Sequence, residues 1–244
     1  DMYREGVDPY VVNAATLYHV PLDEVTKDQR QRGKLMELAC VFLGGAGAQQ
    51  SMGRGFGLVL TDNEAGALRD AWRAANPWAM AYGRELERAA MSAVLHPGGW
   101  FEAGRVAYGC NGDWLWCRLP STRLIAYYQP KLEGKMTPWG DEVTTITASA
   151  GGRVKTKVGT WRRLALWPGM LLENITQATA ADLLRESLLA CEDDGVPVVL
   201  HVHDEIVSLG DCRDQLHAIM TEQRPWAAGL PLAAESGGGM RYGK

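Results

Sequence analysis

The chain has 244 residues, of which 46% are hydrophobic and 22% charged, a composition typical of globular proteins that excludes disordered and collagen-like chains. Its 25 Lys and Arg residues against 29 Asp and Glu residues give a net charge of -4, so any anion-binding site must be local. No apolar run reaches the roughly 18 residues of a bilayer span and no leader pattern opens the chain, so we expect a soluble, cytoplasmic protein without a membrane partner.

The first hundred residues have the pattern of a helical lobe. The first predicted helix begins with the capping-box pair Thr26 and Gln29 and ends at the glycine-rich run 44–47, where we expect a flexible turn. Proline-containing steps at 76–77 and 96–97 end two further helices. The three helices are therefore predicted over residues 26–43, 62–75 and 78–95.

The rest of the chain combines strands with one long helix. The predicted elements, in chain order, are hairpins over 104–128 and 143–158, a helix over 170–193, two short strands over 196–209 and a helix from about 211. Helices followed by strands with helices predict an α+β fold rather than a doubly wound parallel sheet. We expect one compact unit with two lobes, a helical lobe at 1–100 and a β-rich lobe at 101–244.

Four residues spaced four apart form one stripe along the first predicted helix. Arg30 and Lys34 place two cations on its N-terminal half, and Leu38 and Phe42 place two apolar side chains on its C-terminal half. This pattern suits a ligand with a polyanionic end and a flat apolar end, such as a nucleoside triphosphate. The alternative is a solvated basic turn with the two apolar residues in a core.

The segment 197–209 places two acids, Asp204 and Glu205, at the tip between two apolar strands. A magnesium ion held by carboxylates and substrate phosphates would compensate their charge, as in phosphoryl and nucleotidyl transfer. One alternative is a hairpin turn with solvated acids. Another is a zinc hydrolase that uses His201, His203 and Asp204, although such a site would need a further ligand at suitable spacing.

Two weaker signals concern nucleic acid. Gln177 lies in the long predicted helix and could reach a base edge, or it could be an ordinary amide on the helix surface. A basic stretch without acids could bind phosphates, although lysines also protect the edges of hairpins from strand pairing. The stretch contains Arg153, Lys155, Lys157, Arg162 and Arg163.

Taken in order, these segments resemble the family A DNA polymerases, the group of bacterial DNA polymerase I, and most closely their bacteriophage replicative branch. The four segments that carry the resemblance are 5–10 with 14–15, 30–42, 173–182 and 203–205. Further similarity lies in 72–77, 119–123 and 231–242. The resemblance extends over nearly the whole chain, and it implies templated DNA synthesis from dNTPs.

The resemblance implies a nucleotide-binding role for the stripe. Arg30 and Lys34 would bind the incoming triphosphate, with Tyr10 near its phosphates. Leu38 occupies the position at the sugar. Phe42 takes the place of the family's tyrosine beside the nascent base pair.

The resemblance also implies a catalytic role for the acidic tip. Asp204 would hold the catalytic magnesium ions, two in the complete site, with Glu205 in support. His203 would approach the primer end, and Gln177 would read the minor groove of primer-template DNA, where acceptors are common to all base pairs.

One family segment is absent from the printed sequence. The first catalytic motif, of the Asp-x-Ser-x-x-Glu type, should precede Asp1, and the family's thumb and any proofreading exonuclease are missing from these residues as well. We therefore expect fingers and the C-terminal part of the palm, incomplete alone and completed by a polymerase portion in cis or in trans. The alternative is a non-catalytic nucleotide- or DNA-binding remnant, or one subunit of a split polymerase.

Overall fold

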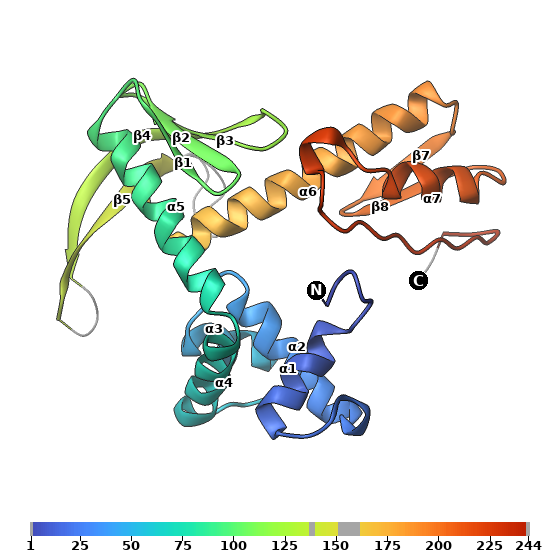
Figure 1. The fold of residues 1–244 in the computed structure, drawn as a ribbon, viewed down its shortest axis with the longest axis horizontal. Helices are drawn as coiled ribbons and strands as arrows, with labels where there is room; N and C mark the ends of the chain where they lie inside the picture. Colours follow the sequence, from blue (N-terminus) through green and yellow to red (C-terminus); the bar gives the residue numbers. More distant parts are fainter. Residues whose placement is uncertain (1, 137–139, 151–161, 243–244) are drawn as a thin grey trace. The chain divides into compact units, whose positions relative to one another are not determined.

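The computed structural model describes residues 2–136, 140–150 and 162–242 (Figure 1). The described part combines α-helices with antiparallel strands, which confirms the predicted α+β class. The helices are α1 (Pro9–Tyr18), α2 (Lys27–Cys40), α3 (Ala46–Gly55), α4 (Asp62–Ala75), α5 (Pro77–Leu95), α6 (Pro168–Asp193) and α7 (Arg213–Thr221). The strands are β1 (Trp100–Ala103), β2 (Val106–Cys110), β3 (Trp114–Arg118), β4 (Leu124–Met136), β5 (Glu142–Ala150), β6 (Arg162–Ala165), β7 (Val198–Val202) and β8 (Glu205–Ser208).

The chain divides into two compact units. Unit 1 comprises Asp1–Cys117 and Leu124–Asn174, and unit 2 comprises Arg118–Arg123 and Ile175–Lys244. This division differs from the expected boundary between residues 100 and 101. The reason lies in packing, because α5 contacts β1, β2 and β4 and so joins the first helices to the strands in one unit.

Capping explains where the predicted helices of unit 1 begin. The Thr26 amide donates to Gln29 Oε1 at 2.9 Å, and the Gln29 amide donates to Thr26 Oγ1 at 3.3 Å, which completes the predicted capping box. Thr61 and Glu64 form a second capping box at the start of α4. Pro77 occupies the first turn of α5, where its missing N–H costs no hydrogen bond.

The end of the first predicted helix was placed too late. α2 ends at Cys40, because Leu43 has a φ of 60° and its N–H bonds to the Cys40 carbonyl, which reverses the chain. The prediction of a flexible turn over 44–47 was also wrong in part. Gly45 is the N-cap residue of α3, which begins at Ala46. Helices α1 and α3 were not predicted.

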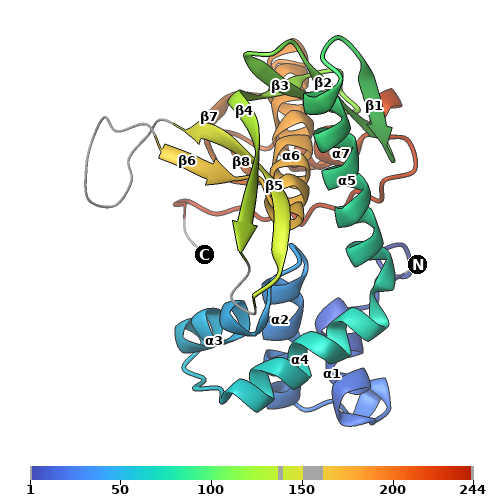
Figure 2. The same cartoon turned by 90° about the vertical axis from the view of Figure 1, so that its left-hand side faces the viewer.

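The strands of unit 1 form one sheet in the order β1-β2-β3-β4-β5-β6. The predicted turns near 111 and 120 are confirmed. Strand β1 was not predicted, since the predicted hairpin began at residue 104 and β1 comes directly before it. Strand β6 pairs with β5, and residues 151–161, which include part of the predicted 143–158 hairpin and Arg153, Lys155 and Lys157, lie outside the described residues. Figure 2 shows the same arrangement from the side.

Unit 2 contains most of α6 together with a two-stranded antiparallel sheet and α7 (Figure 1). Its core consists of buried side chains from three of these elements and the loop before β7, namely Cys191, Val196, Ile206 and Ile219. The predicted long helix, the predicted strand pair and the final helix are all confirmed. Among the described residues, no helix has the length and apolar character that a membrane crossing requires.

Candidate functional site

The N-terminal half of α2 brings three predicted site residues together in unit 1. The Arg30 guanidinium carbon lies 5.2 Å from the centre of the Tyr10 ring, and Lys34 Nζ lies 5.8 Å from it. Lys34 Nζ also lies 5.7 Å from the Phe56 ring centre. The two cations therefore lie beside aromatic faces, which attract positive charge without neutralising it. Only Arg30 of the two has a carboxylate partner among the described residues.

Asp8 holds this cluster in place. Its Oδ1 accepts a hydrogen bond from the Tyr10 amide at 2.8 Å and so caps α1, while its Oδ2 accepts from Arg30 Nε at 2.7 Å. Partial burial raises the pKa of Asp8, but the hydrogen bonds from Arg30 and from the Tyr10 amide outweigh this and lower the pKa below its usual value. The Asp8-Pro9 pair is a helix-start signal that the sequence prediction missed.

A close contact between α1 and α2 sets the spacing of the cluster. A Cβ atom on Gly33 would lie 2.1 Å from the Tyr10 carbonyl oxygen, so only glycine permits this approach. Further along α2, Glu37 Oε2 accepts hydrogen bonds at 2.7 Å from Asn13 Nδ2 of α1 and from Trp72 Nε1 of α4. These contacts keep the Tyr10 ring beside the cations of α2.

The apolar half of the predicted stripe is only partly realised. Leu38 lies on α2 and is 36% exposed. Phe42 follows the end of the helix and is half-buried in a turn, so it does not continue the stripe as predicted. The physical reason is the reversal at Leu43, which removes Phe42 from the helical repeat.

The acidic tip of unit 2 is a tight β-hairpin. Val202 pairs with Glu205, so His203 and Asp204 form a two-residue connection with both side chains exposed. His203 has a φ of 55°, the sign that both common two-residue hairpin turns require at this position. Glu205 is half-buried, and its Oε2 accepts a hydrogen bond from Tyr242 Oη at 3.2 Å. Asp204 makes no side-chain hydrogen bond or ion pair with the described residues.

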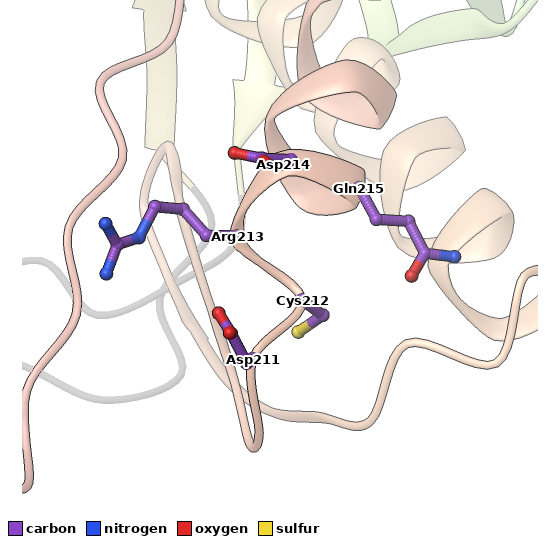
Figure 3. Close-up of a pocket in the computed structure, with 5 residues that line it drawn as sticks. All are labelled: Asp211, Cys212, Arg213, Asp214 and Gln215. Carbon is purple, nitrogen blue, oxygen red and sulfur yellow. The ribbon is translucent and has the colours of Figure 1, made fainter.

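The carboxylates at this tip are suitable oxygen ligands for magnesium, but they form a partial set. Within the described ranges, no group of three or more His, Cys, Asp and Glu side chains is arranged to hold a metal ion. The zinc alternative with His201, His203 and Asp204 therefore lacks its ligand cluster. A pocket lies nearby in sequence, at the start of α7 (Figure 3), but five consecutive residues line it and none of them was predicted as a site residue.

Gln177 is exposed on α6, next to a buried ionic network in unit 2. Asp182 is 1% exposed and accepts hydrogen bonds from Ser121 Oγ and Arg123 Nε, while Arg123 also donates to the Ala178 carbonyl oxygen at 2.7 Å. These bonds hold the loop before β4 against α6, close in sequence to Gln177. In the sequence, only the family resemblance of residues 119–123 points to this network.

No protein-family model matches the chain. The chain is 37% identical over 233 residues to the DNA polymerase of Bacillus phage SP02. The matched region covers 93% of this chain and 35% of the phage protein. The resemblance to a DNA polymerase is confirmed. The fold is also similar to the POL domain of Pol1 from M. smegmatis in complex with DNA primer-template and dNTP, with a TM-score of 0.52 and 18% identity over 97% of this chain and 34% of that one. The chain thus spans about a third of the length of either protein.

The predicted site residues fall into two sets. Tyr10, Arg30, Lys34, Leu38 and Phe42 belong to unit 1, whereas Gln177, His203, Asp204 and Glu205 belong to unit 2. Within unit 1, the structure brings the first three together. Asp8 and Phe56 were not predicted, although the Asp-Pro pair signalled the former.

Proposed function

We propose that this chain is the nucleotide-binding and acidic-hairpin portion of a DNA-directed DNA polymerase that extends a primer on a DNA template. The likeness to a phage DNA polymerase along 93% of the chain carries the proposal, because a match of that length extends into both units. In this proposal the site residues of unit 1 belong to the fingers of the polymerase, and those of unit 2 belong to the C-terminal part of its palm. The partners are dNTPs and primer-template DNA.

In this proposal the α2 cluster binds the triphosphate of the incoming nucleotide. Arg30 presents a planar guanidinium suited to two phosphate oxygens, and Lys34 adds a compact charge one turn further along the helix. Tyr10 orients both cations through its ring face. Leu38 and Phe42 supply apolar surface for the sugar and base. The cations offset the charge that develops on the leaving pyrophosphate.

The acidic hairpin would hold the metal ions. Asp204 is exposed and unpaired among the described residues, which leaves both carboxylate oxygens available, and Glu205 supports it from β8. When bound, two Mg²⁺ ions would supply the charge that activates the primer 3′-hydroxyl and stabilises the pyrophosphate. Further carboxylates must come from a polymerase portion outside these residues, in cis or in trans.

His203 and Gln177 would contact DNA. His203 stands beside Asp204 on the turn, where it would approach the primer end, and Gln177 is exposed on α6, from which it would read minor-groove acceptors. A non-catalytic remnant or a split subunit is the second candidate. It is favoured by the observation that the described residues contain no complete ligand cluster for a metal.

The test is primer extension by a polymerase that contains this chain together with the complementary N-terminal portion. Asp204→Ala should lower the rate at least about a thousandfold, because a metal ligand is lost. Asp211→Ala removes another exposed aspartate of unit 2 and should leave the rate unchanged. Equal activity of both variants contradicts the proposal. An inactive parent that still binds dNTPs supports the non-catalytic alternative.

A further inference from the structure

A row of aromatic side chains occupies one face of the unit 1 sheet. On β3, Leu115 and Cys117 are fully buried, so Trp114 and Trp116 lie on the opposite face. The centres of these two rings are 5.6 Å apart with 28° between their planes. Tyr128 of β4 continues the row, with its ring centre 4.7 Å from that of Trp114.

The row extends to β1 through a glycine. Trp100 pairs with Gly109 across β1 and β2, and a Cβ atom on Gly109 would lie 2.9 Å from the indole, so the ring lies directly over the strand. Trp100 is 46% exposed. Between it and Trp116 lies a depression of about 200 Å³ whose lining includes the backbone of Gly98 and Gly99. Trp100, Gly109, Cys110, Asn111 and Trp116 also line it, so two indole rings and three glycines border a space that a flat ring can enter.

Exposed cations lie on strands of the same sheet. The sequence of residues 98–166 contains ten Lys and Arg residues and five Asp and Glu residues, and seven of the ten cations are among the described residues. Among the described residues, Lys131, Lys135 and Arg162 are exposed on β4 and β6. Stacked aromatic rings within a locally basic region are the combination by which proteins bind single-stranded nucleic acid.

We propose that the aromatic face formed by Trp100, Trp114, Trp116 and Tyr128 binds single-stranded DNA by stacking its unpaired bases. Every base has a π-face, so this binding would be tolerant of sequence, whereas the bases of a duplex are already stacked on one another. The choice of DNA rests on the proposed function. The four residues of this face are different from those of the α2 cluster and of the acidic hairpin.

The test measures the fluorescence anisotropy of a labelled oligothymidylate of about 12 nucleotides bound to the full chain, without metal or dNTP. Trp100→Ala and Trp116→Ala should each weaken binding about tenfold, and Trp116→Phe should retain most of it. Trp78→Ala is the control, because it removes an exposed indole of α5 outside this face. Circular dichroism melting identifies any variant that fails to fold.

An abasic strand of the same length separates stacking from charge. Wild-type protein should bind it about as weakly as Trp116→Ala binds oligothymidylate, because the phosphates remain and the bases are absent. Equal affinity for the abasic strand and oligothymidylate overturns the proposal. Unchanged affinity of folded Trp100→Ala and Trp116→Ala for oligothymidylate also overturns it, and would favour a protein partner for this face. Since the assay requires no catalysis, its failure is distinguishable from a failure of the Asp204 experiment.

Discussion

Two aspartates of unit 2 have opposite environments. Asp182 is 1% exposed and is held by Ser121, Arg123 and Arg185, the last of which places its guanidinium 3.4 Å away. Asp204 is exposed at a hairpin tip and makes no side-chain hydrogen bond or ion pair with the described residues. The buried carboxylate is fully used by the fold, whereas the exposed one remains available for a ligand. The same residue type therefore serves structure in one place and, in our proposal, chemistry in the other.

Alanine at each position should separate these roles. Asp182→Ala leaves Arg123 without its carboxylate partner and should lower the free energy of unfolding by about 1–3 kcal/mol, because the lost acceptor is buried whereas Arg123 is 35% exposed. Asp204→Ala should change it by less than about 0.5 kcal/mol. Urea unfolding followed by circular dichroism measures both. Similar losses at the two positions would break the comparison.

Arg30 and Lys34, two of the four cations of α2, offer the same contrast in unit 1. Lys34 makes no ion pair among the described residues, so Lys34→Ala should raise the KM for dNTP about tenfold or more at unchanged stability. Arg30 bonds to Asp8, so Arg30→Ala should also lose up to about 1 kcal/mol of stability. Lys27→Ala, at an exposed cation of the first turn, is the control. An equal effect of Lys27→Ala on KM would contradict specific binding by Lys34.

Two turns with positive φ sharpen the comparison further. Thr122, beside the Asp182 network, has a φ of 70°, and His203, beside Asp204, has a φ of 55°. Glycine relieves this strain, so Thr122→Gly and His203→Gly should each stabilise the chain by about 0.5–1 kcal/mol after the entropic cost of glycine. Only His203→Gly should reduce primer extension. Thermal unfolding and extension assays on both variants decide this.

The smallest expected effect is a pH dependence from Asp8. Because its pKa is lower in the folded chain than in the unfolded chain, the unfolded state takes up this proton first as the pH falls. The contribution is fully present above about pH 4 and is lost as the pH falls through the folded value. It should stay well below 1 kcal/mol, because the ion pair is partly exposed. In the Asp8→Asn variant, the free energy of unfolding, measured by urea unfolding at a series of pH values, should fall less steeply below about pH 4 than in the wild type.

Local signals explain which elements could be predicted. The capping box at Thr26, the proline at 77 and the apolar strands on either side of His203 and Asp204 specify elements through contacts between residues close in sequence, and the structure has all of them. Helix α3 was missed because its start is a glycine without a side-chain cap. The aromatic face was missed because its rings come from separate strands and meet only in the sheet.

The sequence by itself determined the α+β class, the α2 cations and the acidic hairpin tip, because each depends on residues that are neighbours along the chain. The tertiary structure alone decided that Tyr10 lies beside Arg30 and Lys34, since Gly33 admits the backbone of α1. It alone decided that the Asp182 carboxylate accepts a hydrogen bond from Arg123, which lies 59 residues earlier in the chain. Such pairings depend on how elements pack, and packing depends on side-chain volumes and hydrogen-bond partners that no local pattern records.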